Sequence, residues 1–126
     1  MAHLPGTADE VRARVPAVLD AWAHIRDDVL RGGIVDPELK RLCFRYVAED
    51  PDVADVGRFA EPERLALEWA HAIAWDSDRA DDELWERLHA TFSEPELVEL
   101  GCAIGFALGQ QHWERTLGLP AQAGIS

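Results

Sequence analysis

The sequence predicts an all-α domain of about five to six helices. Apolar residues recur at helical spacing along most of the chain, and several segments begin with helix-capping patterns. No stretch shows the strand-like alternation that hairpin turns would bound. With 126 residues, 48% of them hydrophobic, the chain is long enough for one core. We therefore expect a single domain over residues 1–126, with loose termini at 1–6 and 119–126.

Two capping patterns near the N-terminus indicate the first helical segments. Thr7 is followed three residues later by Glu10, which is the spacing of a capping box. Pro16 restarts or kinks the helix, and the glycines at 32–33 end it. The apolar face between them consists of Val18, Leu19, Trp22, Ile25, Val29 and Leu30.

Three further helices are predicted over residues 36–50, 61–75 and 82–91. Asp36 and Pro37 begin the first of them with a side-chain cap and a proline at the first helical position. This helix ends before Pro51, because the residue preceding a proline avoids helical geometry. Residues 50–60 are the longest irregular stretch of the chain.

The last predicted helix, from Ser93 to Gly118, is the longest and the most apolar. Ser93 and Glu96 have capping-box spacing. Over residues 97–109 the only charged residue is Glu99. A helix that is apolar on all sides is usually buried on most of them, and we expect this here.

Three glycines in this helix, Gly101, Gly105 and Gly109, lie four residues apart and form a smooth stripe. Each one weakens the helix by roughly 1 kcal/mol relative to alanine. Three such costs in register predict that another backbone approaches closely along this line.

The charge balance argues against nucleic acid or an anionic membrane surface as a partner. The chain carries 24 acidic and 12 basic residues, a net charge of −12, whereas phosphate binding needs clustered lysine and arginine. No membrane-spanning run and no signal peptide are visible, and the two cysteines form no C-x-x-C pair. We therefore expect a cytoplasmic protein with reduced thiols.

The second half of the chain resembles the carboxymuconolactone decarboxylase-like superfamily, which includes the alkylhydroperoxidase D proteins. Four stretches carry the resemblance: GGIVDPELKRL over 32–42, ERLALEWA over 63–70, FSEPELVEL over 92–100 and HWERTLGL over 112–119. The resemblance covers roughly residues 30–120. It implies a helical fold of this family's type and homo-oligomers such as dimers, trimers or hexamers.

One departure from the family's pattern bears on activity. The peroxidase branch carries Cys-x-x-Cys followed closely by His, whereas here Cys43 stands alone, with Tyr46 three residues later and no His after it. Residues 48–60 are too short to hold the missing turn and helix. Thiolate chemistry needs two sulfurs within bonding range, so we do not expect thiol peroxidase activity. The decarboxylase branch instead implies cofactor-independent acid–base chemistry on a small organic acid or lactone.

Candidate catalytic residues lie on one face of the predicted helix over 61–75. Glu68, His71 and Trp75 follow at spacings of three and four. Histidine is a common general base, so His71 could act as one that Glu68 orients, while Trp75 could wall a ligand pocket. The alternative is a surface Glu–His pair of little consequence.

A second candidate group lies near the end of the last helix. His112 is an alternative base, Arg115 could hold a carboxylate with two parallel hydrogen bonds, and Trp113 could line the pocket. Arg115 could equally form a structural salt bridge. We expect no cofactor and no metal, because the histidines have no ligand spacing beyond Glu68 and His71.

Two other function classes stay open. One is a non-catalytic oligomeric binding or scaffold member that has kept the family's fold. The other, which the lone cysteine disfavours, is a thiol-dependent antioxidant that uses Cys43.

Overall fold

The helices begin at the capping residues that the sequence predicts. In the computed structural model, which describes residues 3–119, Thr7 and Ser93 each form a complete capping box. The side chains of Asp36 and Asp81 accept hydrogen bonds from backbone N–H groups in the first turn of the next helices. These residues satisfy N–H groups that a helix leaves unpaired at its start, so local sequence fixes where these four helices begin.

The described residues form six α-helices and several shorter helical turns, with no strand among them, so the all-α prediction is confirmed. The helices are α1 (Ala8–Arg12), α2 (Pro16–Ile25), α3 (Pro37–Val47), α4 (Glu61–Trp75), α5 (Asp82–Thr91) and α6 (Glu94–Thr116). A π-helical turn, η1 (Arg26–Leu30), extends α2, and three 3₁₀ turns are η2 (Pro51–Val53), η3 (Val56–Arg58) and η4 (Ser77–Arg79). The irregular stretch over 50–60 therefore contains η2 and η3. Of the predicted loose termini, residues 1–2 and 120–126 lie outside the described part.

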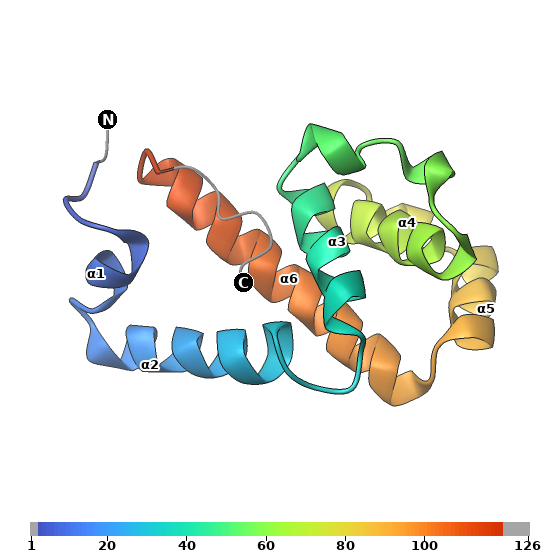
Figure 1. Cartoon of the computed structure of the whole chain (residues 1–126), viewed down its shortest axis with the longest axis horizontal. Helices are drawn as coiled ribbons and strands as arrows, with labels where there is room; N and C mark the ends of the chain where they lie inside the picture. Colours follow the sequence, from blue (N-terminus) through green and yellow to red (C-terminus); the bar gives the residue numbers. More distant parts are fainter. Residues whose placement is uncertain (1–2, 120–126) are drawn as a thin grey trace.

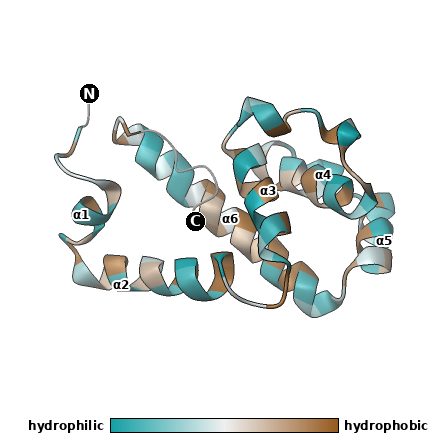
Figure 2. Cartoon of the chain, viewed as in Figure 1, coloured by the Kyte–Doolittle hydropathy of each residue, from teal (hydrophilic) through white to brown (hydrophobic). Residues whose placement is uncertain are grey.

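Helix α6 crosses the middle of the molecule and touches both groups of helices. Figure 1 shows α1 and α2 on one side, and α3, α4 and α5 at the other end of α6. The main hydrophobic core joins α3, α4, α5 and the first half of α6. Figure 2 shows that the hydrophobic residues of α6 concentrate in the half that crosses α3. The core residues with full burial include Cys43, Val47, Leu65, Leu67, Leu88, Leu100 and Ile104.

One face of α6 is exposed, which differs from the predicted burial on most sides. Val98 is 67% and Phe106 is 40% exposed, and no atom of the described residues outside the helix's own backbone lies within 4 Å of a Cβ added at Gly105 or Gly109. Gly101 does have a close neighbour, but it is the indole ring of Trp69, 2.7 Å from an added Cβ, and not a backbone. Within residues 3–119 the predicted close approach of a backbone along the glycine stripe is therefore not found.

The single charge in the apolar part of α6 points inward and ties three segments together. Glu99 accepts hydrogen bonds from the backbone N–H groups of Ile34 (3.0 Å) and Val35 (2.7 Å). The fully buried Lys40 places its Nζ 2.8 Å from Glu99 and donates to the carbonyls of Val29 (2.7 Å) and Gly32 (2.6 Å). The ammonium thus caps the end of the α2–η1 segment, while the carboxylate holds the loop before α3.

Glycine is required at position 33 for two reasons: the backbone conformation there, and the lack of room for a side chain. Its φ is +91°, in the left-handed region that glycine adopts without steric cost. A Cβ at this position would lie 1.9 Å from Oε1 of Glu99. Any side chain here would therefore displace the carboxylate that pairs with Lys40.

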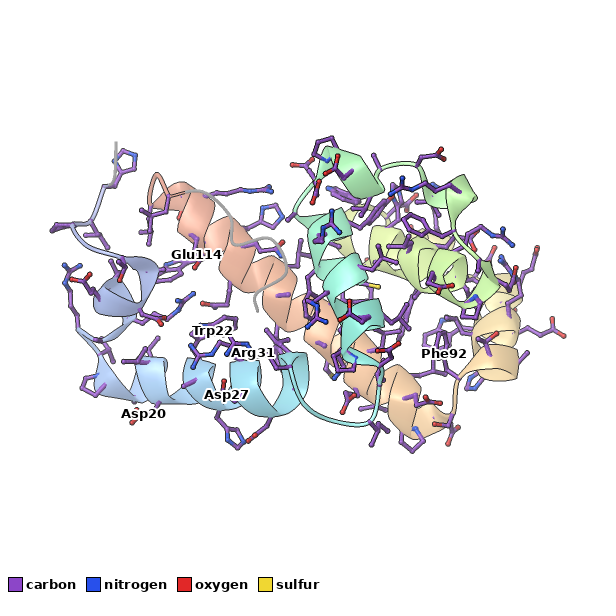
Figure 3. The ribbon with its side chains drawn as sticks, in the orientation of Figure 1. Asp20, Trp22, Asp27, Arg31, Phe92 and Glu114 are labelled. Atoms are coloured by element: carbon purple, nitrogen blue, oxygen red, sulfur yellow. The ribbon has the colours of Figure 1, made fainter. Side chains whose placement is uncertain are left out.

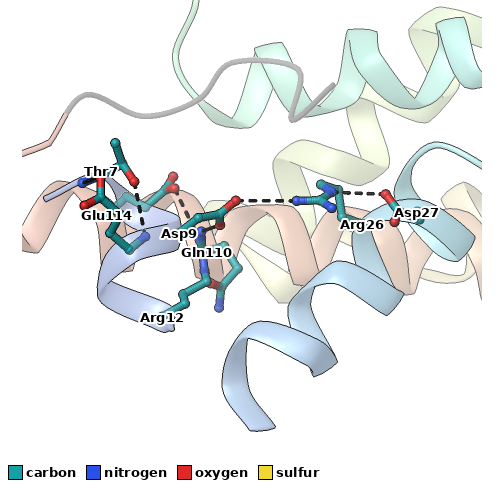
Figure 4. A network of polar contacts seen from close by, with 8 residues as sticks. Thr7, Asp9, Arg12, Arg26, Asp27, Gln110 and Glu114 are labelled. Atoms are coloured by element: carbon teal, nitrogen blue, oxygen red, sulfur yellow. Dashed lines mark hydrogen bonds and ion pairs between the residues drawn. The ribbon is translucent and has the colours of Figure 1, made fainter. Parts of the chain in front are cut away.

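The α1–α2 arm is fixed to the last turns of α6 by Arg12, which is only 2% exposed. Its guanidinium lies 4.7 Å from the ring of Trp22 and 5.0 Å from that of Trp113, so it is held between two indoles. It also bonds to Gln110 (2.9 Å) and Glu114 (3.2 Å), as Figure 4 shows. Figure 3 shows Trp22 pointing from α2 toward α6.

No helix within residues 3–119 combines the length and the apolar character that crossing a bilayer would require.

Replacement of Glu99 should destabilise the protein and change its acid sensitivity. Burial acts to raise the pKa of Glu99, but the hydrogen bonds from Lys40, Val35 and Ile34 outweigh it, so the pKa lies below its ordinary value. The stabilising contribution is complete above the ordinary carboxyl pKa and is lost as pH falls through the lowered one. We expect Glu99→Gln to lower the free energy of unfolding by roughly 2–4 kcal/mol at pH 7, measured by urea titration.

The exposed Glu86 of α5 offers a matched control. Glu86→Gln should change the free energy of unfolding by less than about 0.5 kcal/mol. The difference between the Glu99→Gln and wild-type proteins should shrink as pH falls toward 3. A Glu99→Gln protein as stable as the Glu86→Gln control would show that the carboxylate does not hold this junction.

Candidate functional site

A pocket of about 450 Å³ opens between α3, α4 and the start of α5. We call it the Arg79 pocket. Buried leucines from α4 and α5 make its apolar part, and charged side chains from α4, η4 and α5 surround them. Its lining consists of Tyr46, Val56, Leu67, Glu68, His71, Arg79, Asp81, Glu83, Leu84 and Arg87. A ligand with an apolar body and an ionised group would be complementary to this pocket.

Tyr46 and His71 meet at the wall of this pocket. The hydroxyl oxygen of Tyr46, in the last turns of α3, lies 2.8 Å from Nδ1 of His71 in α4. Burial raises the pKa of Tyr46, and the nearby charge of Arg79 offsets this only in part. The hydroxyl is therefore protonated at neutral pH and shares one proton position with the imidazole, whose tautomer decides which group donates.

Glu68 forms an ion pair with Arg87 of α5. The carboxylate accepts a hydrogen bond of 2.8 Å from Arg87, and this interaction raises the pKa of Arg87 above its ordinary value. The bonded partner of His71 is Tyr46, whereas the sequence suggested that Glu68 would orient the imidazole. The guanidinium of Arg79 makes no ion pair or side-chain hydrogen bond within residues 3–119, so its charge is available at the pocket.

A second pocket of about 310 Å³ shares Tyr46 and His71 with the first. We call it the Trp75 pocket, and its other lining residues are Glu49, Asp50, Ala54 and Trp75. Trp75 is 44% exposed, and its ring centroid lies 5.1 Å from that of His71 and 5.7 Å from that of Tyr46. Tyr46 and His71 thus lie between the Arg79 pocket and the Trp75 pocket, which are lined by different charged residues.

The residues predicted at the end of α6 do not line either pocket. Arg115 donates to the carbonyl of Ala48 (2.7 Å) and pairs with Glu49 (3.2 Å). Trp113 packs against the guanidinium of Arg12, and His112 is exposed on α6. None of these three lines the Arg79 or the Trp75 pocket. The structure therefore brings Glu68, His71 and Trp75 together on α4, and it gives Arg115 a structural salt bridge.

Sequence reasoning missed Tyr46 and Arg79 as site residues. From the sequence, Tyr46 is notable only as the residue three positions after Cys43. A tyrosine hydroxyl that is partly buried usually has a hydrogen-bond partner, and this general rule could have indicated that Tyr46 bonds to a polar side chain. The loop position of Arg79 carries no such signal, because its place beside Tyr46 depends on tertiary packing.

The two cysteines lie in different environments. Cys43 is fully buried, and burial raises the pKa of its thiol to about 12, so the reactive thiolate is absent at neutral pH. Cys102 is exposed on α6. Within the described residues, no group of three or more histidine, cysteine or acidic side chains comes together as a metal site.

Comparison of the chain with protein-family models, with curated proteins and with solved structures finds no match.

A thiol reagent should distinguish the two cysteines sharply. In the folded protein at pH 8, we expect Ellman's reagent to modify Cys102 within minutes, and Cys43 only after denaturant is added. The Cys102→Ser variant should show no rapid phase. Rapid reaction of the folded Cys102→Ser protein would mean that Cys43 is accessible as a thiolate, contrary to its burial.

Proposed function

We propose that this chain is a cofactor-independent acid–base enzyme of the carboxymuconolactone decarboxylase-like type, acting on a small organic acid or lactone. The hydrogen bond between Tyr46 and His71 at the wall of the Arg79 pocket is the observation that carries the proposal. It joins an imidazole, which can accept a proton from a substrate, to a neutral hydroxyl donor, beside the guanidinium of Arg79, which has no ion-pair partner within residues 3–119.

In the proposed mechanism His71 is the general base. When Nδ1 carries the proton and donates it to the hydroxyl oxygen of Tyr46, Nε2 keeps its lone pair and can take a proton from the substrate. The hydroxyl hydrogen of Tyr46 is then free to bond to the oxygen on which negative charge develops. The raised pKa of Tyr46 favours this role, because the hydroxyl remains protonated while the substrate oxygen becomes charged.

Arg79 takes the role of anion clamp in this proposal, in place of Arg115. Its guanidinium lines the pocket without a protein carboxylate as partner, whereas Arg115 already binds Glu49 and the Ala48 carbonyl. A guanidinium holds a carboxylate with two parallel hydrogen bonds, which fixes the substrate relative to His71.

A second candidate function is that of an oligomeric binding or scaffold protein without catalysis. The exposed, uncharged face of α6 favours it, and we propose that this face forms a homo-oligomer in either case. The exposed face of α6 consists of Val98, Cys102, Gly105, Phe106 and Gly109. Charged residues are depleted from the centres of protein interfaces, and glycines allow close approach of helices.

The catalytic proposal predicts proton exchange that depends on His71. Lactone carboxylates and keto acids in D₂O should be followed by proton NMR for exchange of the hydrogen next to the carbonyl, or for conversion. We expect His71→Gln to lower the rate for an active compound by 10²-fold or more, and Tyr46→Phe by roughly tenfold. The exposed His24, which pairs with Asp28, gives the control His24→Gln, which should retain full activity. Activity that survives His71→Gln would contradict the proposed base.

The oligomer proposal predicts a mass above that of one chain. Light scattering coupled to size-exclusion chromatography should give a multiple of 14.0 kDa for the wild type. Phe106→Glu should shift the protein to a monomer, because it places a charge in the proposed interface. Val18→Glu, at an equally exposed valine on α2, should not. A monomeric wild type would refute the proposed assembly.

A further inference from the structure

Helix α3 ends in a turn that normally selects glycine, and here the residue is Glu49. The N–H of Glu49 bonds to the carbonyl of Tyr46, and that of Asp50 to the carbonyl of Arg45, both at 3.0 Å. This is a Schellman motif, whose first residue beyond the cap adopts a left-handed conformation. Glu49 has φ +65° and is the only non-glycine residue with positive φ among residues 3–119. A strained backbone that persists at a site raises the question of what the side chain does there.

The side chain of Glu49 lines the Trp75 pocket together with Asp50. The pKa of Asp50 is lowered by the backbone N–H of Asp52 and by Arg45, so this carboxylate is ionised at neutral pH. Each of the two carboxylates has an arginine partner: Arg115 at 3.2 Å from Glu49, and Arg45 at 2.8 Å from Asp50.

The arginine partners do not line the pocket, whereas the carboxylates do. Neither Arg45 nor Arg115 is among the described residues around the Arg79 or the Trp75 pocket. Glu49 and Asp50 are the charged side chains that line the Trp75 pocket, and no described arginine or lysine lines it. The Arg79 pocket also has carboxylates, from Glu68, Asp81 and Glu83, but there a ligand meets two guanidinium groups, those of Arg79 and Arg87. Tyr46 and His71 lie on the border between these two environments.

We propose that Glu49 is a specificity-determining residue that restricts this site to monoanions. Its carboxylate repels a second negative charge at the Trp75 pocket, so a substrate's one carboxylate lies on Arg79 and its uncharged end lies toward Trp75. This inference rests on the proposed function, and it names the substrate class of the same site. It also explains why a glutamate occupies a turn position that suits glycine better.

The size of the effect follows from elementary electrostatics. Two like charges about 8 Å apart, at the effective dielectric constant of about 20 that applies near a protein surface, repel enough to weaken binding roughly thirtyfold, and we expect screening by Arg115 and solvent to reduce this to roughly five- to tenfold. Pairing of Glu49 with Arg115 reduces this but does not abolish it, because the arginine lies outside the pocket. The net charge of −12 adds a weaker, salt-dependent repulsion of dianions.

Benzoate and terephthalate are matched probes, because they share a ring and differ by one carboxylate. Isothermal titration calorimetry should give wild-type protein an affinity for benzoate roughly five- to tenfold above that for terephthalate. Glu49→Gln should reduce this ratio to about twofold or less, mainly by tighter binding of terephthalate. Glu49→Gly should do the same, with a melting temperature equal to or up to about 4 °C above that of the wild type, because glycine suits the turn.

Two further variants separate the possible outcomes. Asp52→Asn removes a nearby exposed charge that lines neither pocket, so it should leave the ratio unchanged. Arg79→Gln should weaken the binding of both probes. If Arg79→Gln does so while both Glu49 variants keep the wild-type ratio, the specificity inference is wrong and the proposed function stands. If benzoate does not bind, or binds Arg79→Gln as well as wild type, the proposed anion site and the inference both fail.

Discussion

The buried pair of Lys40 and Glu99 is the interaction on which the arrangement of the helices depends. Removing a charge from water is costly unless its partners replace the lost hydration, and here each charge has at least three partners within hydrogen-bond distance. Those partners come from η1, the loop before α3, α3 itself and α6. One ion pair therefore holds α3 across α6, and Gly33 leaves the space that this requires.

The candidate site follows from the placement of α3. Tyr46 lies near the end of this helix, and it reaches His71 only because α3 and α4 pack in a fixed register against α6. The same helix end carries Glu49, which Arg115 of α6 holds in place. The charges around the Tyr46–His71 pair thus differ on its two sides, with two arginines and three carboxylates at one pocket and two carboxylates without a described cation at the other.

Features set by neighbouring residues could be predicted from the sequence, whereas features set by tertiary packing could not. The capping boxes at Thr7 and Ser93 depend on residues three apart, and both are present. Glu68, His71 and Trp75 share a helix face for the same reason. Tyr46, the hydrogen-bond partner of His71, lies 25 positions away in the sequence, and Glu49, the partner of Arg115, lies 66 positions away. Helical spacing carries no information about either pair. For the glycine stripe, spacing identifies a smooth surface but not what covers it, and within residues 3–119 no backbone is found against Gly105 or Gly109.

The most direct test of this account is amide hydrogen exchange at Ile34 and Val35, whose N–H groups bond to Glu99. If the buried pair fixes the loop before α3, these two amides should exchange only through global unfolding, as slowly as the core amides of α6. Exchange at the rate of an exposed loop, with α6 still protected, would show that the loop opens independently. The position of α3, and with it the contact between Tyr46 and His71, would then need another explanation.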